Sequence, residues 1–412
     1  MSEASAARRV VITGAGAVSP AGLGTQGLWE AMRDGRSLIG PYTLAYDPAP
    51  PPKPRIAAAV RDFDPTTHFE DRKLGLLDRV SQFALVAARE AVRQAGIEFA
   101  KEELGDRTAI IIGTGIGGEL SRDEQCQKLY RDGSPRIHPM SIVRLMPNAP
   151  ASQAAMEFGI MGPAFAVSSA CASANHALAQ AFQMVRSGLV DAALSGGTEA
   201  CLSYATFKAW EAMRVLADDT CRPFSRQRRG LVLGEGAGIF VLESLEHAQR
   251  RGATILAELA GVGMSSDAGD IVAPSAVGAS KAMLRALADA RMNAQDVDYI
   301  NAHGTGTPAN DPTECSAIRL AFGEHANTLA ISSTKSVHGH ALGAAGALEL
   351  VALLGAIREG VIPPTANFTE ADPQCDLDVV PNVAREHRVR AALSNSFAFG
   401  GLNAVVALRA MP

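Results

Sequence analysis

CASANHALAQAFQMVRSG, residues 171–188, is a helical segment rich in small residues that decides the fold because its pattern recurs later in the chain. A candidate strand follows it at 190–200, VDAALSGGTEA. The second copy is GAAGALELVALLGAIREG at 343–360, which also ends at a glycine, the common helix stop, and is followed by RVRAALSNSFAFGG at 388–401. This repeat predicts two α/β halves that arose by duplication.

A second repeat supports the same division. The helical apolar stripe of 77–96 precedes RTAIIIGTGIGG at 107–118, a buried strand that runs into glycines. The helical pattern of 278–295 likewise precedes VDYINAHGTGTP at 297–308. Both strands therefore end in Gly-Thr-Gly, in the same order of elements.

The helices are apolar on most sides, which is typical of helices enclosed between sheets. The sequence therefore predicts a layered architecture with mixed sheets and buried central helices. We expect the join between the halves within 250–266, with an N-terminal half at 1–255 and a C-terminal half at 256–412.

The bulk composition is that of an ordinary globular protein. The chain has 412 residues, 47% hydrophobic and 20% charged, with a formal net charge of −5 and no long blocks of like charge. This charge gives no reason to expect nucleic acid or a membrane surface as a partner. The apolar stretch 348–357 is far shorter than the ~20 residues that span a bilayer, and the N-terminus has no secretory pattern. We expect a cytoplasmic protein.

The six cysteines are scattered and never form a CxxC pair, which favours reduced thiols over disulfides or a zinc site. His338 lies two residues before His340, but no further ligand stands at zinc-like spacing, so we expect no metal there. The proline-rich 47–54 is expected to be a surface excursion. ITGAGAVSPAG at 12–22 resembles a dinucleotide fingerprint but lacks its third glycine and its acidic residue, so we interpret it as a tight strand-to-loop turn.

Cys171 is the first residue of the helical segment 171–188. A helix N-terminus stabilises a thiolate, which is the reactive form of cysteine, yet a packed small hydrophobe remains equally open from this segment alone. His303 and His340 both lie among glycines at predicted strand ends in the other half, where they form a plausible convergent site with Cys171. His176 points to another helix face and is interpreted as a packing residue.

Four motifs carry a family resemblance: VSSACAS at 167–173, NAHGTGTPANDPTE at 301–314, STKSVHGHALGAAGALE at 333–349 and SNSFAFGGLNA at 394–404. Their order and spacing resemble the β-ketoacyl-acyl-carrier-protein synthases of the elongating type, similar to synthases I and II of bacterial fatty acid synthesis. The resemblance implies the α/β thiolase fold, with two βαβαβαββ halves in a five-layer αβαβα arrangement, and a homodimer.

The resemblance also implies a catalytic triad. Cys171 would take an acyl chain from an acyl carrier protein as a thioester. His303 and His340 would hydrogen-bond the malonyl thioester and assist loss of carbon dioxide, after which the carbanion attacks the Cys171 thioester. The enzyme would need no cofactor of its own, because phosphopantetheine arrives on the acyl carrier protein together with the acyl and malonyl thioesters.

Supporting residues follow from the same resemblance. Lys335 and Glu349 match a charged pair beside the triad. Glu349 also belongs, with Asn301, Ser394 and Asn395, to the positions where some relatives hold a structural monovalent cation.

The remaining matches concern the substrate channel. Thr305 and Thr307 match threonines that contact the pantetheine arm. Phe399 matches a gating phenylalanine, and its backbone N–H would form the oxyanion hole with that of Cys171. Ile116 falls where the family lines the acyl pocket.

Two departures from the family pattern surround the gate. Ala398 replaces the middle glycine of the usual SFGFGGTN motif and Leu402 replaces its threonine, so we expect a stiffer or differently posed loop. Together with His338, these differences resemble the nodulation-type branch, which makes specialised acyl chains.

Several alternatives remain. A thiolase needs a second cysteine where this chain has Phe399, and an initiating condensing enzyme has asparagine in place of His340. A non-catalytic partner, like the chain-length factors, lacks the nucleophile that Cys171 supplies. A Rossmann-type oxidoreductase would bind nicotinamide.

Overall fold

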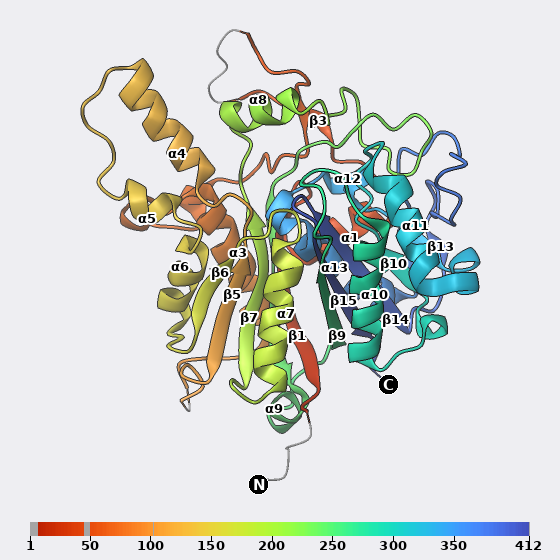
Figure 1. Ribbon diagram of the computed structural model, residues 1–412. Helices are drawn as coiled ribbons and strands as arrows, with labels where there is room; N and C mark the ends of the chain where they lie inside the picture. Colours follow the sequence, from red (N-terminus) through yellow and green to blue (C-terminus); the bar gives the residue numbers. More distant parts are fainter. Residues whose placement is uncertain (1–6, 45–49, 102, 412) are drawn as a thin grey trace.

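The computed structural model describes residues 7–44, 50–101 and 103–411 and contains two five-stranded mixed sheets, one from each half, which join into one strand order and have helices on both faces (Figure 1). The first half contributes β1 (Val10–Ser19), β5 (Thr108–Gly113), β6 (Ala164–Val167), β7 (Ala192–Glu199) and β8 (Gly236–Ser244). The second half contributes β9 (Ala257–Ser266), β10 (Tyr299–Asn301), β11 (Ala330–Ser332), β14 (Ala391–Ala398) and β15 (Leu402–Arg409).

The strand order shows the duplication directly. It runs β6-β5-β7-β8-β1 in the first half and β9-β15-β14-β10-β11 in the second, which is the mirror order. The pairing senses also agree: β5 is parallel to β6 and β7, β10 is parallel to β11 and β14, and the remaining pairs are antiparallel. The sheets of the two halves are continuous because Val10–Ile12 of β1 pair with residues 257–259 of β9.

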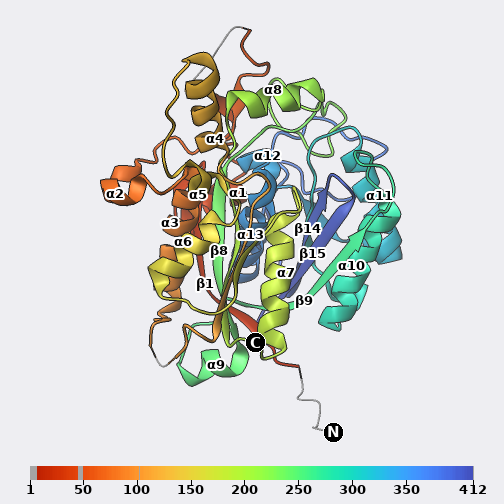
Figure 2. The ribbon, with the colours of Figure 1, turned by 60° about the vertical axis from the view of Figure 1, so that its left-hand side comes forward.

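Each half follows the predicted order βαβαβαββ. The helices of the first half are α3 (Arg79–Ala95), α6 (Ala149–Phe158) and α7 (Ser173–Arg186), and those of the second are α10 (Ala276–Ala290), α11 (Asn310–Phe322) and α13 (Ala345–Glu359). α3 and α6 cover one outer face and α10 and α11 the other, while α7 and α13 lie between the two sheets (Figures 1 and 2). These are the predicted five layers.

The central helices are buried because their residues are small and apolar. Eleven of the fifteen residues of α13 are buried, and the helix ends at Gly360 in the left-handed conformation, with φ 65°. α7 ends one turn residue before Gly188, which has φ 78°. The glycines therefore stop both central helices, as predicted. The outer helix predicted at 278–295 is shorter, because Arg291 adopts the left-handed conformation after Ala290.

The interpretation of 12–22 as a strand-to-loop turn is wrong for its first eight residues. β1 continues to Ser19, and its glycines face α3: a Cβ on Gly14 would lie 2.1 Å from the Ala91 carbonyl oxygen, and one on Gly16 2.0 Å from that of Ala87. Glycine is required there so that helix and strand can approach closely. These glycines do not open a helix, so they form no dinucleotide-binding turn.

The same close packing occurs in the second half. A Cβ on Gly263 of β9 would lie 2.0 Å from the Ala282 carbonyl oxygen of α10, and one on Gly261 would lie 2.4 Å from the Ala290 nitrogen. The duplication has therefore kept both the strand order and the contact between the first strand and first outer helix of each half.

The smaller elements lie at the periphery and in the connections. They are β2 (Gly22–Leu23), α1 (Thr25–Arg33), β3 (Gly40–Pro41), β4 (Ile56–Ala57), α2 (Asp71–Leu74), α4 (Glu119–Cys126), α5 (Ser141–Leu145), α8 (Tyr204–Ala212), α9 (Leu245–Arg250), α12 (Lys335–His338), β12 (Val361–Ile362) and β13 (Arg385–Glu386). Three of the eight residues of the predicted proline-rich excursion, 47–49, lie outside the described residues. Within the described part of the chain, no helix is long and apolar enough to cross a membrane.

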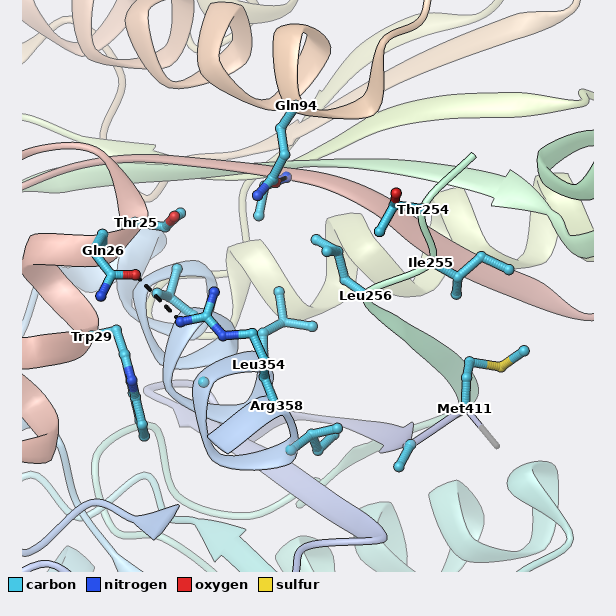
Figure 3. A pocket seen from close by; sticks show the side chains of 15 residues that line it. Thr25, Gln26, Trp29, Gln94, Thr254, Ile255, Leu256, Leu354, Arg358 and Met411 are labelled. Carbon is cyan, nitrogen blue, oxygen red and sulfur yellow. Dashed lines mark hydrogen bonds between the residues drawn. The ribbon is translucent and has the colours of Figure 1, made fainter. Parts of the chain in front are cut away.

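A cavity of about 420 Å³ lies at the seam between the halves (Figure 3). Its lining includes Thr254 and Leu256, just before β9, and Leu354 of α13. The Arg358 guanidinium at its edge already donates to Gln26 Oε1, at 3.3 Å. None of the predicted site residues lines this cavity, so it is separate from the predicted site.

We predict that Gly14→Ala lowers the free energy of unfolding by about 2 kcal/mol, because its methyl group must displace the α3 backbone. Gly75→Ala is the matched control: its φ is −59° and the nearest atom to an added Cβ lies 3.6 Å away, so stability is retained. Urea unfolding followed by circular dichroism measures both. Equal stability of the two variants would contradict the packing argument.

Candidate active site

Cys171 lies in the tight turn between β6 and the start of α7. Ala170, just before it, has a positive φ of 48°, and the Ser173 N–H donates to the Ala170 carbonyl, at 3.2 Å. The thiol residue is 6% exposed and precedes the first helical residue by two positions. The structure thus places Cys171 at a helix N-terminus, where the sequence predicted it.

The two predicted histidines converge on this thiol from the other half. His340 follows α12 and its Nε2 lies 3.1 Å from Cys171 Sγ. His303 follows β10, and its ring centre lies 5.5 Å from that of His340, at an interplanar angle of 83°. Three residues separated by up to 169 positions thus form one compact cluster.

Backbone contacts hold the His303 loop in place. Glu314 of α11 accepts hydrogen bonds from the N–H groups of His303 and Gly304, at 2.8 and 2.7 Å. Asn395 Nδ2 donates to the same carboxylate, at 3.2 Å. No role was assigned to Glu314 from the sequence, because its burial and its contacts with the His303 loop appear only in the folded chain.

Burial determines the protonation of the cluster. It raises the pKa of the Cys171 thiol to about 12, although the Lys335 charge opposes this. It also lowers the pKa of His303 and of His340 well below the ordinary histidine value, and Lys335 adds to both shifts. The resting site therefore contains a neutral thiol beside two neutral imidazoles.

Lys335 and Glu349 form an ion pair with both side chains fully buried, as expected from the family pattern. Lys335 lies in α12 and Glu349 in α13, so the pair ties the histidine loop to the central helix. A buried charge needs a partner of opposite sign, and removal of either partner leaves the other unpaired.

A cavity of about 190 Å³ leads to the cluster. Cys171, His303 and His340 line it together with Thr305, Thr307, Trp210, Phe397 and Phe399. The Phe399 ring stacks on Trp210, with ring centres 5.8 Å apart. The structure thus brings the predicted threonines and gate residue to the same cavity, and adds Trp210, which the sequence did not single out.

Ile116 does not line this cavity. It packs against an apolar cluster that includes Cys171, Leu202, Leu342 and Ala398, and this cluster shares Cys171 and Ala398 with the cavity lining. The cluster therefore connects Ile116 with the wall of the cavity beside the thiol.

Three of the four positions expected to bind a monovalent cation have a buried oxygen without a hydrogen-bond partner. Asn301 Oδ1, Asn395 Oδ1 and Glu349 Oε2 are buried and have no hydrogen-bond partner. Two carbonyl oxygens and a carboxylate oxygen are ligands that suit a hard cation, and Ser394 lies beside Asn395. The donor set therefore fits a monovalent cation.

The two other histidines considered in the sequence, His338 and His176, do not contact the thiol and hydrogen-bond elsewhere. His338 is fully buried, with Nε2 3.0 Å from Thr334 Oγ1, and burial lowers its pKa to about 3. His176 Nδ1 lies 2.8 Å from Ser169 Oγ. Among the residues that the structure describes, no cluster of three or more His, Cys, Asp and Glu could hold a metal ion, and the six cysteines are all free thiols.

The departures at the gate lie in one hairpin. Ala398 ends β14, pairs with Leu402 of β15, and has an ordinary extended backbone. The turn between them contains Gly400 and Gly401 with φ of 82° and 67°, and the Gly401 N–H donates to the Ala398 carbonyl, at 3.0 Å. The left-handed positions that require glycine are thus still glycine.

Two family models match the chain: the beta-ketoacyl synthase N-terminal domain at residues 7–248 and the C-terminal domain at 256–369. The chain therefore belongs to the beta-ketoacyl synthase family and is an acyltransferase-type condensing enzyme. This confirms the predicted class, and no finding favours a thiolase or a non-catalytic partner.

Individual relatives cover nearly the whole chain. Nodulation protein E of Rhizobium sp. (strain N33) is 52% identical over 402 residues, which are 98% of this chain and 99% of that protein. The 3-oxoacyl-[acyl-carrier-protein] synthase 2 of Synechocystis sp. is 42% identical over 412 residues, 98% of each. This matches the expected likeness to synthase II and its nodulation-type branch.

A solved structure extends the likeness to three dimensions. A chain of a type II PKS acyl-carrier protein in complex with its ketosynthase matches with a TM-score of 0.88 and 32% identity, covering 98% of this chain and all of that one. Together with two five-stranded sheets around a helical central layer, this likeness confirms the predicted thiolase fold.

We predict that the rate of Cys171 alkylation by iodoacetamide rises about tenfold per pH unit from pH 7 to pH 9. A raised thiol pKa keeps Cys171 protonated over this range, so only a growing minority of thiolate reacts. Mass-spectrometric peptide mapping separates Cys171 from the exposed Cys126. A rate that stays constant between pH 6 and pH 9 would instead show a thiolate–imidazolium pair.

Proposed function

We propose that this condensing enzyme joins an acyl chain held on Cys171 to a malonyl unit on an acyl carrier protein, giving a 3-oxoacyl chain two carbons longer. The observation that carries the proposal is the contact between Cys171 Sγ and His340 Nε2, with His303 beside them in one cavity. The pair supplies a nucleophile, and the two imidazoles supply donors for an enolate.

In the first half-reaction the thiol of Cys171 attacks the acyl thioester of the carrier protein. His340 Nε2, at 3.1 Å, accepts the thiol proton as the S–C bond forms. The backbone N–H groups of Cys171 and Phe399 are proposed to stabilise the oxyanion. The carrier thiol then leaves and takes up a proton, so that one thioester replaces another.

In the second half-reaction the malonyl thioester loses carbon dioxide. The electron pair of the broken C–C bond moves to the thioester oxygen as an enolate, and neutral His303 and His340 each donate a hydrogen bond to it. The enolate carbon then attacks the Cys171 thioester, the C–S bond breaks, and the Cys171 thiolate that leaves takes up a proton from solvent to regenerate the thiol. Lowered histidine pKa values support this role, because a neutral imidazole remains a donor while it can also accept the thiol proton.

An acyl carrier protein is the proposed partner, and its phosphopantetheine removes any need for a resident cofactor. The names of the relatives point to it, since one is a 3-oxoacyl-[acyl-carrier-protein] synthase and another is a ketosynthase solved with a carrier protein. Thr305 and Thr307, whose hydroxyl oxygens lie 2.9 Å apart on the cavity wall, are proposed to bind the pantetheine arm.

Asn301, Glu349, Ser394 and Asn395 are proposed to hold a monovalent cation, as the unpartnered oxygens of Asn301, Glu349 and Asn395 suggest. Such an ion would neutralise the free oxygen of Glu349 and stiffen the loops that follow β10 and precede α13. It takes no part in the transfer steps above.

The cargo is proposed to be a specialised acyl chain. Identity to nodulation protein E, at 52%, exceeds the 42% identity to the Synechocystis synthase 2. We also propose a cytoplasmic location, because five of the six free cysteines are buried as thiols, which suits a reducing compartment.

A homodimer is proposed through the edge strand β6. β6 ends the strand order of the first half and its Ala164 is exposed. Large apolar side chains are also exposed nearby, with Met161 at 76%, Met156 at 68% and Leu189 at 57%. Apolar exposure beside an open edge favours pairing with a second copy. Light scattering after gel filtration would give twice the chain mass, and a monomer would overturn this part of the proposal.

We predict that Cys171→Ala abolishes condensation while malonyl-carrier decarboxylation continues, because both histidines remain. Products are identified by mass after incubation with malonyl carrier protein and a panel of acyl carrier thioesters. Normal chain extension by this variant would refute the nucleophile assignment.

His303→Ala and His340→Ala are expected to lose decarboxylation by about 10²-fold or more, since each removes a donor to the enolate. His387→Gln, a change at an exposed histidine, is the control and retains activity. Release of labelled carbon dioxide provides the measurement. Undiminished release from both site variants would exclude the proposed role of the histidines.

A further inference from the structure

Glu199, the last residue of β7, is a fully buried carboxylate that the steps above do not use. Oε2 accepts hydrogen bonds from the backbone N–H groups of Gly115, at 2.7 Å, and Gly343, at 2.9 Å. Oε1 accepts from Thr114 Oγ1, at 3.1 Å, and from the Ile116 N–H, at 3.3 Å. All four donors are uncharged, and burial raises the pKa of Glu199 to about 7.

The four donors belong to loops from different halves. Residues 114–116 follow β5 in the first half, while Gly343 follows His340 by three residues in the second. The loops touch at the carboxylate: a Cβ on Gly343 would lie 2.2 Å from the Gly115 nitrogen and 2.7 Å from Glu199 Oε2. Glu199 therefore forms a junction between the two halves, because it binds the backbones of one loop from each half.

This junction adjoins the nucleophile. Ser168 Oγ donates to the Gly115 carbonyl, at 3.1 Å, which connects the 114–116 loop to the turn that holds Cys171. Ile116 and Leu342, one from each loop, pack in the apolar cluster that contains Cys171. A shift of either loop would thus change the apolar wall beside the thiol.

We infer that Glu199 is a positioning residue that fixes Ile116 beside Cys171 and so determines which acyl chains the thiol accepts. This inference rests on the proposed function, in which Cys171 holds the acyl chain. Glu199 touches no reacting atom and acts through the loop that it holds.

The chemistry of the four donors makes the inference specific. In Glu199→Gln, with the NH₂ group in the place of Oε1, the amide oxygen still accepts the hydrogen bonds from the backbone N–H groups of Gly115 and Gly343. The Thr114 hydroxyl can turn to accept from that NH₂, but the Ile116 N–H cannot accept and loses its partner. The isosteric substitution therefore releases Ile116 while it preserves the junction of the halves.

The test compares transfer from acyl carrier thioesters of increasing chain length to Cys171 in the wild type, Glu199→Gln and Ile116→Ala. We expect Glu199→Gln to change the ratio of kcat/KM for long and short acyl chains about tenfold, in the same direction as Ile116→Ala. Malonyl decarboxylation stays unchanged, because His303 is held by Glu314 and not by Glu199.

Glu243→Gln is the matched control for loss of stability. Glu243 is also fully buried, but it pairs with Ala192 at the opposite end of β7 and binds Arg251 and His247. Its substitution lowers stability and leaves the chain-length ratio unchanged. An unchanged ratio in folded Glu199→Gln, with a shifted ratio in Ile116→Ala, would overturn the inference and leave the proposed function intact.

A second pair of variants applies where Glu199→Gln does not fold. Thr114→Val removes one donor to Oε1, while Thr114→Ser keeps it. We expect the valine variant alone to shift the chain-length ratio, and equal ratios would overturn the inference. Failure of the wild type to acylate Cys171 would instead refute the proposed function.

Discussion

The structure depends on one packing constraint: α7 and α13 must fit side by side between two sheets. They do so because glycines stand where α7 is approached most closely. A Cβ on Gly346 of α13 would lie 2.3 Å from Asn175 Oδ1 of α7, and one on Gly113 of β5 would meet the Ser173 backbone at 2.4 Å. With this spacing, the residues preceding the two helices meet, and Cys171 of one half faces His340 of the other at 3.1 Å.

The enclosed position also determines the chemistry. Desolvation disfavours charge, so the thiol stays protonated and the imidazoles stay neutral until a substrate arrives. Lys335 and Glu349 form a fully buried ion pair beside this site. In the proposed mechanism, charge separation between Cys171 and His340 is therefore confined to the transfer step, where the nearby Lys335 would favour the thiolate form.

The sequence contained the repeat, the layers and the convergence of Cys171, His303 and His340, because periodicity, glycine stops and motif spacing are local signals. Contacts made only in the folded chain were not predictable in this way. Gly14 and Gly16 indicated a turn, yet their role is contact with Ala91 and Ala87 of α3, some 70 residues away. Glu199 was also overlooked. A single acidic residue at the end of an apolar strand does not show that residues 114–116 and Gly343 of the other half will donate hydrogen bonds to it.

Comparison of the duplicated strands shows where the halves have diverged. β7, AALSGGTE, and β14, AALSNSFA, occupy equivalent places in their sheets and share their first four residues. At the last position the first half has Glu199, whose carboxylate fixes two loops, and the second has Ala398, which leads into the hairpin of Phe399. At the glycines of that hairpin, the Gly401 N–H donates to the Ala398 carbonyl and the Gly400 N–H donates to the Ile271 carbonyl. Under our inference, the same strand end fixes the wall on one side of Cys171 and leaves the proposed gate on the other, so that selectivity for the acyl chain would arise from the difference between two copies of one motif.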